Sequence, residues 1–278
     1  TTRPMSAPVF RFEPSPKGHQ NLGHALCSFL NFQEAERVGG RFLLRIEDID
    51  LTRCKPEFEE SIYEDLEWLG INWESPVRRQ SDHFEEYAAE LSRLEAEHLL
   101  YASYETRADL ARLITGRDPE GGPRYSRDEG FSPEEAAERE AAGEHYALRL
   151  DMEQALSRVE TPLFWTEVDK QVEAHPERWG DVVLGRKQMP ASYHLAAVLD
   201  DALQGVTHVV RGKDLFESTA VHRLLQELLG LPAPTYRHHH LLVDESGKKL
   251  SKRDASTTLR DLRESGVSVA QIKEAIGL

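Results

Sequence analysis

No apolar run in the sequence approaches the roughly 18–20 residues that a membrane-spanning helix requires. The first residues, TTRPMSAP, lack the apolar core of a secretion signal, so export is not expected. Cysteine is scarce, because Cys27 and Cys54 are the two cysteines of the chain and cannot build a disulfide framework. These absences predict a reduced, cytoplasmic protein that has no association with a membrane.

Positive charge is also in short supply. The 278 residues include 34 Lys and Arg against 49 Asp and Glu, for a net charge of −15. Such a chain does not coat itself broadly with nucleic acid, since phosphate contacts need Lys and Arg. A local basic strip, KKLSKR at residues 248–253, stands inside the acidic whole. Composition is therefore only weak evidence against a nucleic-acid substrate.

Apolar periodicity predicts an α/β fold with a parallel sheet. A strand over residues 9–12 is followed by a helix from Asn21 to about Gly39 and by a second strand in RFLLRIEDID. A strand, helix and strand joined by a right-handed crossover form a parallel pair. Composition turns polar after residue 101, which indicates an inserted lobe. We expect a core in two halves, 1–100 and 188–243, an inserted lobe at 101–187, and a basic loop with a short helical tail at 244–278.

The stretch FRFEPSPKGHQNLGH joins the first strand to the first helix. A helix start presents unpaired N–H groups and attracts phosphate, and Gly18 and Gly23 let the backbone approach a ligand closely. Pro14 stiffens the turn, and His24 lies in the first helical turn, where it can donate to a phosphate oxygen. A stiff loop with a surface histidine explains the same stretch equally well.

The strip KKLSKRD follows an expected strand and places Lys249, Ser251 and Lys252 close together. Two lysines on a short loop could neutralise a polyphosphate as it leaves. Taken alone, however, a run of lysines is more often a solvated surface.

Together, the Asn21-Leu22-Gly23-His24 stretch and the later KLSKR resemble the two signatures of class I aminoacyl-tRNA synthetases. FRFEPSP, RFLLRIEDID and QGVTHVVRGKDL look like the glutamyl branch of that family. The resemblance runs from about Phe10 to Ser256 and implies a Rossmann-like catalytic core. The sequence ends about 25 residues after Arg253, before the anticodon-binding region of glutamyl-type enzymes. In this it resembles the glutamyl-Q tRNA(Asp) synthetases.

The resemblance implies which residues line the sites. Guanidinium groups suit carboxylates, a glutamate side chain can accept from the substrate ammonium group, and hydroxyls can add contacts. Without the resemblance, surface ion pairs and a core tyrosine would explain these residues better. The implied glutamate site comprises Arg11, Ser15, Glu47, Tyr193 and Arg211. The implied ATP site comprises Pro14, Gly23, His24, Lys249, Ser251 and Lys252, with His24, Lys252 and Asn21 in the catalytic role.

The implied reaction is ATP-dependent activation of L-glutamate, with Mg²⁺ entering with ATP, followed by transfer to queuosine in the anticodon loop of tRNA(Asp). A monomer is expected. Three alternatives remain open: a truncated glutamyl-tRNA synthetase that charges a tRNA 3′ end, a tRNA-independent glutamate ligase, and a non-catalytic paralogue.

Two residues depart from the family pattern. Asn21 stands where the first signature begins with histidine, and Glu13 stands where alanine is usual. Unless they are compensated, both changes predict weaker ATP binding or slower activation, which Asn21→His or Glu13→Ala would reverse. Many relatives bind zinc in the inserted lobe through cysteines, but Ala102 and Tyr104 occupy those positions here. We expect no metal site, because His238–His240 are consecutive in a strand and cannot all ligate one ion.

Overall fold

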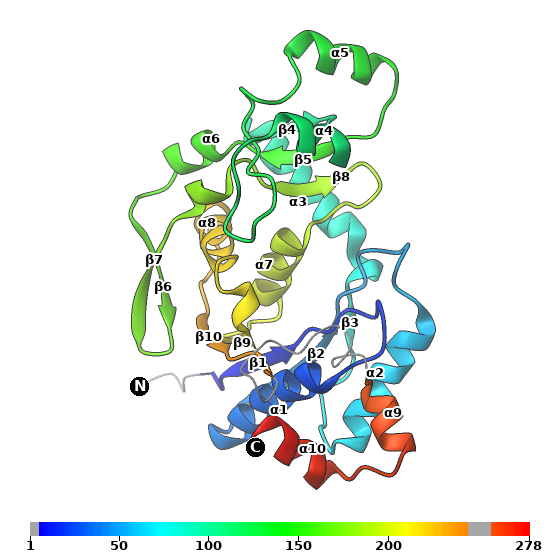
Figure 1. Cartoon of the computed structure of the whole chain (residues 1–278). Coiled ribbons are helices and arrows are strands. Elements are labelled where there is room, and N and C mark those ends of the chain that lie inside the picture. Colours follow the sequence, from blue (N-terminus) through cyan, green and yellow to red (C-terminus); the bar gives the residue numbers. More distant parts are fainter. Residues whose placement is uncertain (1–5, 244–256) are drawn as a thin grey trace. The chain divides into compact units, whose positions relative to one another are not determined.

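The structure is a computed structural model that describes residues 6–243 and 257–278. Its chain separates into two compact units. Unit 1 comprises Thr1–Asp82, Gly205–Phe216 and Pro234–Leu278, and unit 2 comprises His83–Gln204 and Glu217–Ala233. Figure 1 follows the chain through both units, and each is described by itself below.

Unit 1 contains the predicted parallel sheet. Strands β1 (Val9–Phe12), β2 (Arg41–Ile46) and β3 (Arg78–Arg79) lie in that order and run parallel. Strands β9 (His208–Gly212) and β10 (Thr235–His239) form a second parallel pair. The hydroxyl of Thr207 accepts from the backbone N–H of Val9 at 2.8 Å and so ties β9 to β1. The predicted α/β class is confirmed, and because parallel strands end at one edge, the loops after β1, β2 and β9 lie at the same edge.

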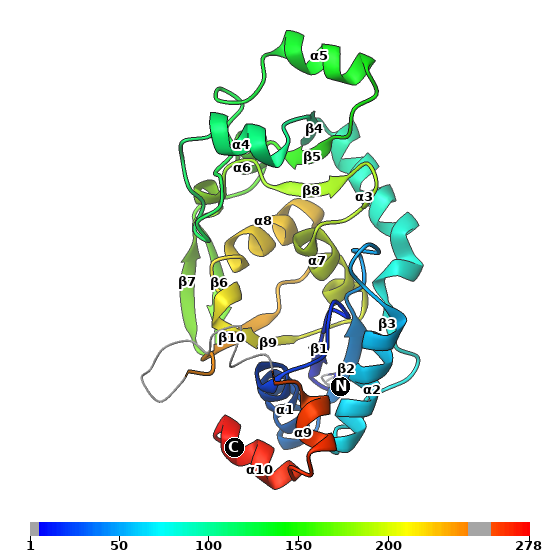
Figure 2. The ribbon, with the colours of Figure 1, turned by 45° about the vertical axis from the view of Figure 1, so that its right-hand side comes forward.

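Helices α1 (Leu22–Arg37) and α2 (Pro56–Trp68) follow β1 and β2, as the periodicity predicts. Helices α9 (Leu259–Glu264) and α10 (Val269–Ile276) pack against α2 and α1 respectively (Figure 2). The core of unit 1 forms where apolar faces of these helices meet the sheet. Its members include Phe10, Phe12, Leu26, Phe29, Leu44, Ile46, Ile62, Leu66, Leu259, Ile272 and Ile276.

The tail helices are anchored beside the turn that precedes α1. The backbone N–H of Leu259 donates to the carbonyl of Gln20 at 2.8 Å. Nη1 of Arg263 donates to the buried carboxylate of Asp65 at 2.9 Å. Burial raises the pKa of Asp65 to about 6, against the opposing effect of Arg263. The tail therefore contributes a wall of unit 1, and the basic residues 248–253 precede it in a segment outside the described residues.

Unit 2 is built on an antiparallel sheet in the order β4-β5-β8, formed by Leu100–Ser103, Ala147–Leu150 and Val183–Arg186. Strands β6 (Leu163–Glu167) and β7 (Lys170–Ala174) form a separate antiparallel hairpin. The helices of this unit are α3 (Phe84–Ala96), α4 (Arg107–Leu113), α5 (Pro133–Ala141), α6 (Met152–Ser157), α7 (Tyr193–Leu203) and α8 (Thr219–Leu229). Of the 3₁₀ turns in the described residues, η2 (Pro176–Trp179) lies in unit 2, η3 (Lys213–Leu215) lies in unit 1, and η1 (Gln80–His83) spans the boundary in the sequence.

Unit 2 combines the segment 101–187 with helices α3, α7 and α8. Within it, the hydroxyl of Tyr87 in α3 donates a buried hydrogen bond of 2.7 Å to Asp200 in α7. None of the helices within residues 6–243 and 257–278 has the length and apolarity to cross a membrane.

Candidate active site

Asn21 is the N-cap of α1. Its side-chain Oδ1 accepts from the backbone N–H of His24 at 3.2 Å, and its own backbone N–H donates to Nδ1 of His24 at 3.0 Å. This reciprocal pair is a capping box in which histidine takes the place usually held by Glu or Gln. Asn21 thus completes the start of the helix. A Cβ on Gly23 would lie 3.2 Å from Oδ1 of Asn21, so a glycine there keeps the cap uncrowded.

The capping box also sets the protonation of His24. Because Nδ1 accepts a hydrogen bond, the neutral ring carries its proton on Nε2, which makes Nε2 a donor. Burial lowers the pKa of His24 to about 4, and the carboxylate of Asp214 acts in the opposite direction. At neutral pH the residue is an uncharged donor at a helix N-terminus, where N–H groups and the helix dipole favour an anion.

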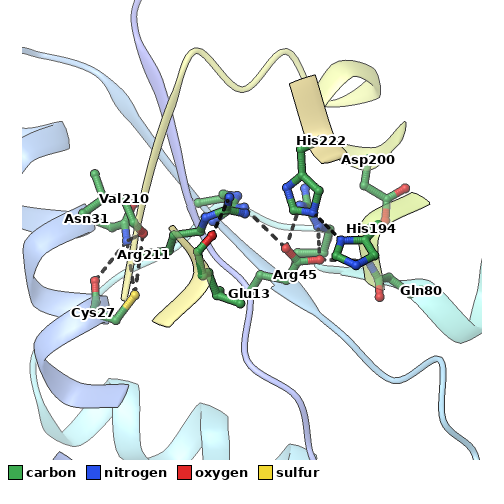
Figure 3. Close-up of polar contacts among 12 residues, drawn as sticks. Glu13, Cys27, Asn31, Arg45, Gln80, His194, Asp200, Val210, Arg211 and His222 are labelled. Carbon is green, nitrogen blue, oxygen red and sulfur yellow. Dashed lines mark hydrogen bonds and ion pairs between the residues drawn. The ribbon is translucent and has the colours of Figure 1, made fainter. Parts of the chain in front are cut away.

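Glu13 lies in a buried network directly after β1. Its carboxylate accepts from Nε and Nη2 of Arg45 at 3.1 and 3.0 Å and from the amide of Gln80 at 2.8 Å (Figure 3). Nη2 of Arg11 lies 3.6 Å from the same carboxylate, and both side chains are 4% exposed. The added negative charge of Glu13 is therefore compensated within the protein, because two guanidinium groups face it.

Glu47 begins the loop after β2. Its backbone N–H donates to the carbonyl of Pro14 at 3.0 Å, which joins this loop to the loop after β1. Burial raises the pKa of Glu47 to about 7, and the charge of Glu13 raises it further, while Lys17 and Arg45 lower it. The carboxyl group is therefore poised between its two forms near neutral pH, and a bound ammonium group would favour the charged form.

Ser15 lies in the loop after β1. Its hydroxyl lies 4.0 Å from the thiol of Cys54, which in turn donates to the carbonyl of Glu47 at 4.0 Å. Through these weak contacts, Ser15 and Glu47 both lie beside Cys54, at the edge of the sheet where β1 and β2 end. Burial raises the pKa of the Cys54 thiol, so this thiol is not activated as a nucleophile.

Arg211 is the penultimate residue of β9 and is 4% exposed. Its Nε donates to Nε2 of His238 on β10 at 3.0 Å, and its Nη2 donates to the carbonyl of Leu215 at 3.4 Å. The guanidinium also lies 5.1 Å from the ring of Tyr236. These contacts hold a positive charge at the same sheet edge as Glu47.

Helix α1 holds β9 in place beside it. The side-chain amide of Asn31 donates to the carbonyl of Val210 at 2.9 Å and to the carbonyl of Cys27 at 3.0 Å (Figure 3). Burial raises the pKa of the Cys27 thiol to about 11, and the charges of Arg11 and Arg211 both act on it in the opposite direction. Both guanidinium groups therefore lie close enough to this thiol to influence it.

Four of the five residues expected to bind glutamate belong to unit 1: Arg11, Ser15, Glu47 and Arg211. Tyr193 begins α7 in unit 2, where its ring centroid lies 6.0 Å from that of His194 and 5.5 Å from that of His222. Of the expected ATP contacts, Pro14, Gly23 and His24 are described here. Lys249, Ser251 and Lys252 lie outside the described residues.

In the inserted lobe, hydroxyl and carboxylate side chains hydrogen-bond to one another near the positions where relatives carry zinc ligands. Glu105 accepts from the hydroxyls of Ser103 and Tyr125 at 2.6 and 2.8 Å and from the backbone N–H of Phe131 at 2.8 Å. Nε of Arg149 donates to Ser103 at 2.9 Å. Such a donor set does not fit structural zinc, which takes thiolate and imidazole ligands. Within the described ranges, no group of three His, Cys, Asp or Glu side chains is placed to hold a metal ion.

Sequence reasoning did not identify Arg45, Gln80 or His238, which hold Glu13 and Arg211. One signal was present for Arg45, because a charged residue inside an otherwise apolar strand needs a buried partner. Gln80 and His238 carried no comparable signal. Their roles follow from which strands are neighbours.

With this geometry established, sequence comparison identifies the family. Residues 9–277 match the family described as tRNA synthetases class I (E and Q), catalytic domain. The chain belongs to this family. It is accordingly an ATP-dependent ligase of the aminoacyl-tRNA synthetase type, as predicted from the two signatures.

Among curated class I synthetases, the chain is 45% identical to the glutamyl-Q tRNA(Asp) synthetase of Rhodobacter capsulatus, over 97% of this chain and 100% of that one. It is 39% identical to the protein of the same name from Symbiobacterium thermophilum, over 93% of this chain and 82% of that one. It is also 40% identical to glutamate–tRNA ligase 2 of a Methylobacterium species, over 94% of this chain and 57% of that one.

The fold agrees with solved synthetase structures. The glutamate-tRNA synthetase of Elizabethkingia anophelis superposes with a TM-score of 0.73 at 26% identity, over 91% of this chain and 54% of that chain. A glutamate tRNA ligase of Elizabethkingia meningosepticum, solved in complex with its amino acid, gives 0.71 at 27% identity, over 91% and 53%. The chain thus spans about half the length of these solved structures, and the Rossmann-like class I core is confirmed.

Proposed function

We propose that this ligase activates L-glutamate with ATP and transfers the glutamyl group to queuosine in the anticodon loop of tRNA(Asp). The observation that carries the proposal is the 45% identity to the Rhodobacter capsulatus glutamyl-Q tRNA(Asp) synthetase, which spans the whole of that protein. The geometry of unit 1 agrees with an acidic amino acid, because it combines two buried guanidinium groups, Arg11 and Arg211, with the carboxyl group of Glu47.

In the proposed complex, Arg11 and Arg211 bind the carboxylates of glutamate and Glu47 accepts from its ammonium group, while Ser15 and Tyr193 add hydroxyl contacts. Guanidinium groups offer paired donors that match a carboxylate. Because the pKa of Glu47 is raised to about 7, binding of the substrate ammonium group favours the charged form of the Glu47 carboxyl group. The binding of glutamate and the release of a proton from Glu47 are then coupled.

In the first step, an α-carboxylate oxygen of glutamate attacks the α-phosphorus of ATP. A new P–O bond forms as the bond to pyrophosphate breaks, and the protein supplies position and charge rather than a nucleophile. Nε2–H of His24, oriented by Asn21, donates to a phosphate oxygen, and Pro14 and Gly23 shape the turn around the nucleotide. Lys249, Ser251 and Lys252 are assigned to the leaving pyrophosphate. Mg²⁺ enters as part of the ATP substrate, since phosphate oxygens supply much of its coordination.

In the second step, a hydroxyl of the queuosine cyclopentene ring attacks the acyl carbon of glutamyl-adenylate. The bond from that carbon to the phosphate oxygen breaks, AMP leaves, and the hydroxyl proton is taken up by the released phosphate group. We expect the protein to act as a monomer, which light scattering would test. We also expect it in the cytoplasm, which cell fractionation would test.

The first experiment is ATP–pyrophosphate exchange with glutamate, glutamine or aspartate, each with and without tRNA. The proposal requires exchange with glutamate in at least one arm, in excess of that with glutamine or aspartate. Exchange with none of them would favour a non-catalytic paralogue and would refute the proposal.

The second experiment measures transfer of labelled glutamate to four RNAs. These are queuosine-bearing tRNA(Asp), the same tRNA without its 3′-terminal adenosine, queuosine-free tRNA(Asp), and tRNA(Glu). We expect label on the first two only. Label on tRNA(Glu) would instead support 3′-end charging, an alternative favoured by the 40% identity to a glutamate–tRNA ligase. Glutamate-dependent exchange with no transfer to any RNA would point to a small-amine acceptor.

A further inference from the structure

Arg211 is held by a histidine on the neighbouring strand. In the parallel pair of β9 and β10, Arg211 and His238 are register partners, so their side chains leave the sheet side by side. Nε of Arg211 donates to Nε2 of His238 at 3.0 Å. An imidazole nitrogen that accepts from a guanidinium carries no proton itself, so the neutral ring has its proton on Nδ1.

The imidazole ring of His238 is itself confined. Its centroid lies 6.0 Å from that of Tyr236 with the two rings nearly parallel, at 6°. The ring of Phe216 meets it edge-on, with centroids 5.2 Å apart and planes at 74°. A ring held on two sides by aromatic neighbours presents Nε2 in one direction, so the acceptor for Arg211 is prepositioned.

The direction of this hydrogen bond decides which edge of the guanidinium can meet a ligand. A guanidinium binds a carboxylate with two donors, either through Nε and one Nη or through both Nη atoms. With Nε of Arg211 donating to His238, bidentate binding has to use the Nη pair. Nη2 also donates to the carbonyl of Leu215 at 3.4 Å, which fixes the rotation of the guanidinium plane.

We propose that His238 is a positioning residue that orients Arg211 for a substrate carboxylate. This inference rests on the proposed function in that Arg211 is assigned to glutamate. His238 does not itself contact the reacting atoms. It restrains rotation of the planar guanidinium about the Cδ–Nε bond and leaves the Nη pair to meet the two oxygens of a carboxylate end-on.

The test compares His238→Ala with His238→Gln, whose side-chain oxygen can accept from Nε, and with His240→Gln as the matched control. His240 is the exposed neighbour in the same histidine run. Loss of a hydrogen bond to a charged group corresponds to about a tenfold loss in affinity. We expect the KM for glutamate to rise about tenfold in His238→Ala. The KM for ATP should change by less than about twofold, given that the orientation acts on the glutamate side alone. His238→Gln should recover most of the loss, and His240→Gln should match the wild type.

A second measurement is independent of catalysis. The Nε–H resonance of Arg211 in ¹H–¹⁵N spectra, assigned with the Arg211→Lys variant, should be protected from exchange in the wild type and in His238→Gln, and exchange-broadened in His238→Ala. If the wild type shows no glutamate-dependent exchange, the proposed function fails, but these spectra still decide the role of His238. The inference is overturned if the resonance is unchanged in His238→Ala, or if the Ala and Gln variants share one KM for glutamate.

Discussion

The carboxylate of Glu13 meets the guanidinium of Arg45 through two hydrogen bonds, of 3.1 and 3.0 Å, with side-chain exposures of 4% and 0%. Glu13, which departs from the family pattern, thus has a partner that neutralises its charge. Asn21, the other departure, also has a structural role, because its side chain caps α1. Both residues therefore have partners that the sequence pattern alone did not reveal.

Glu13→Ala is expected to destabilise the protein rather than activate it. Removing one partner of a buried ion pair leaves the other charged and unpaired, which typically costs about 3–5 kcal/mol. Urea denaturation followed by circular dichroism would measure the change. The control is Glu74→Ala, since Glu74 pairs with Arg41 at the surface, with exposures of 46% and 52%, and should lose no more than about 1 kcal/mol. Equal stability of the Glu13→Ala variant and the wild type would contradict the assignment.

Asn21→His is expected to slow glutamate activation. The substitution replaces the amide oxygen that caps α1 with a bulkier imidazole, whose ring nitrogen accepts only when it carries no proton. This weakens a cap that typically contributes about 1 kcal/mol at the helix start assigned to phosphate. Pyrophosphate exchange should fall and the KM for ATP should rise. Asn21→Ser keeps an acceptor at the N-cap and should stay near the wild type. An increase in exchange for Asn21→His would restore the view that asparagine is a handicap here.

Glutamate binding should strengthen as pH rises through 7. The pKa of Glu47 is raised to about 7, so below that pH its carboxyl is protonated and cannot pair with the substrate ammonium group. Between pH 6 and 8 the ionised fraction of such a group grows about tenfold, and the KM for glutamate should fall accordingly. A flat KM profile in Glu47→Gln, beside a sloping one in the wild type, is the diagnostic result. Matching slopes would remove Glu47 from the site.

The raised pKa of Glu47 affects folding stability in the opposite direction to glutamate binding, because it lowers stability as pH rises. Since the folded pKa exceeds the unfolded one, the folded state favours the protonated form. This contribution is fully present below about pH 4.5 and is lost as pH rises through 7. In Glu47→Gln, the fall in stability over this window should be smaller than in the wild type. Denaturation at a series of pH values would measure it.

The inserted lobe should keep its stability without a metal. Glu105 is held by Ser103, Tyr125 and the backbone of Phe131, so a chelator is expected to leave the melting temperature unchanged. Glu105→Ala should destabilise the protein by about 1–3 kcal/mol, since two buried hydroxyls lose their acceptor. Glu105→Gln, which can still accept, should lose less. One zinc per chain in elemental analysis would contradict the prediction.

The local features of the fold were accessible from local patterns. Strand β1 and helices α1 and α2 appear within a residue or two of where periodicity placed them. The strand expected at His238–His240 begins earlier and ends sooner, because β10 spans Thr235–His239. The error arises because polar residues such as Arg237 can occupy a strand that is exposed on one face. Periodicity alone does not separate such a strand from a loop.

What the sequence determines by itself is short-range: the strand-turn-helix at Pro14 and Gly23, and the order of the two signatures. The tertiary structure decided which distant groups meet. Glu13 lies 32 residues from Arg45 and 67 from Gln80 along the chain, and Arg211 lies 27 from His238. Periodicity and capping act over one or two turns, whereas these pairs exist because parallel strands align side chains across the sheet.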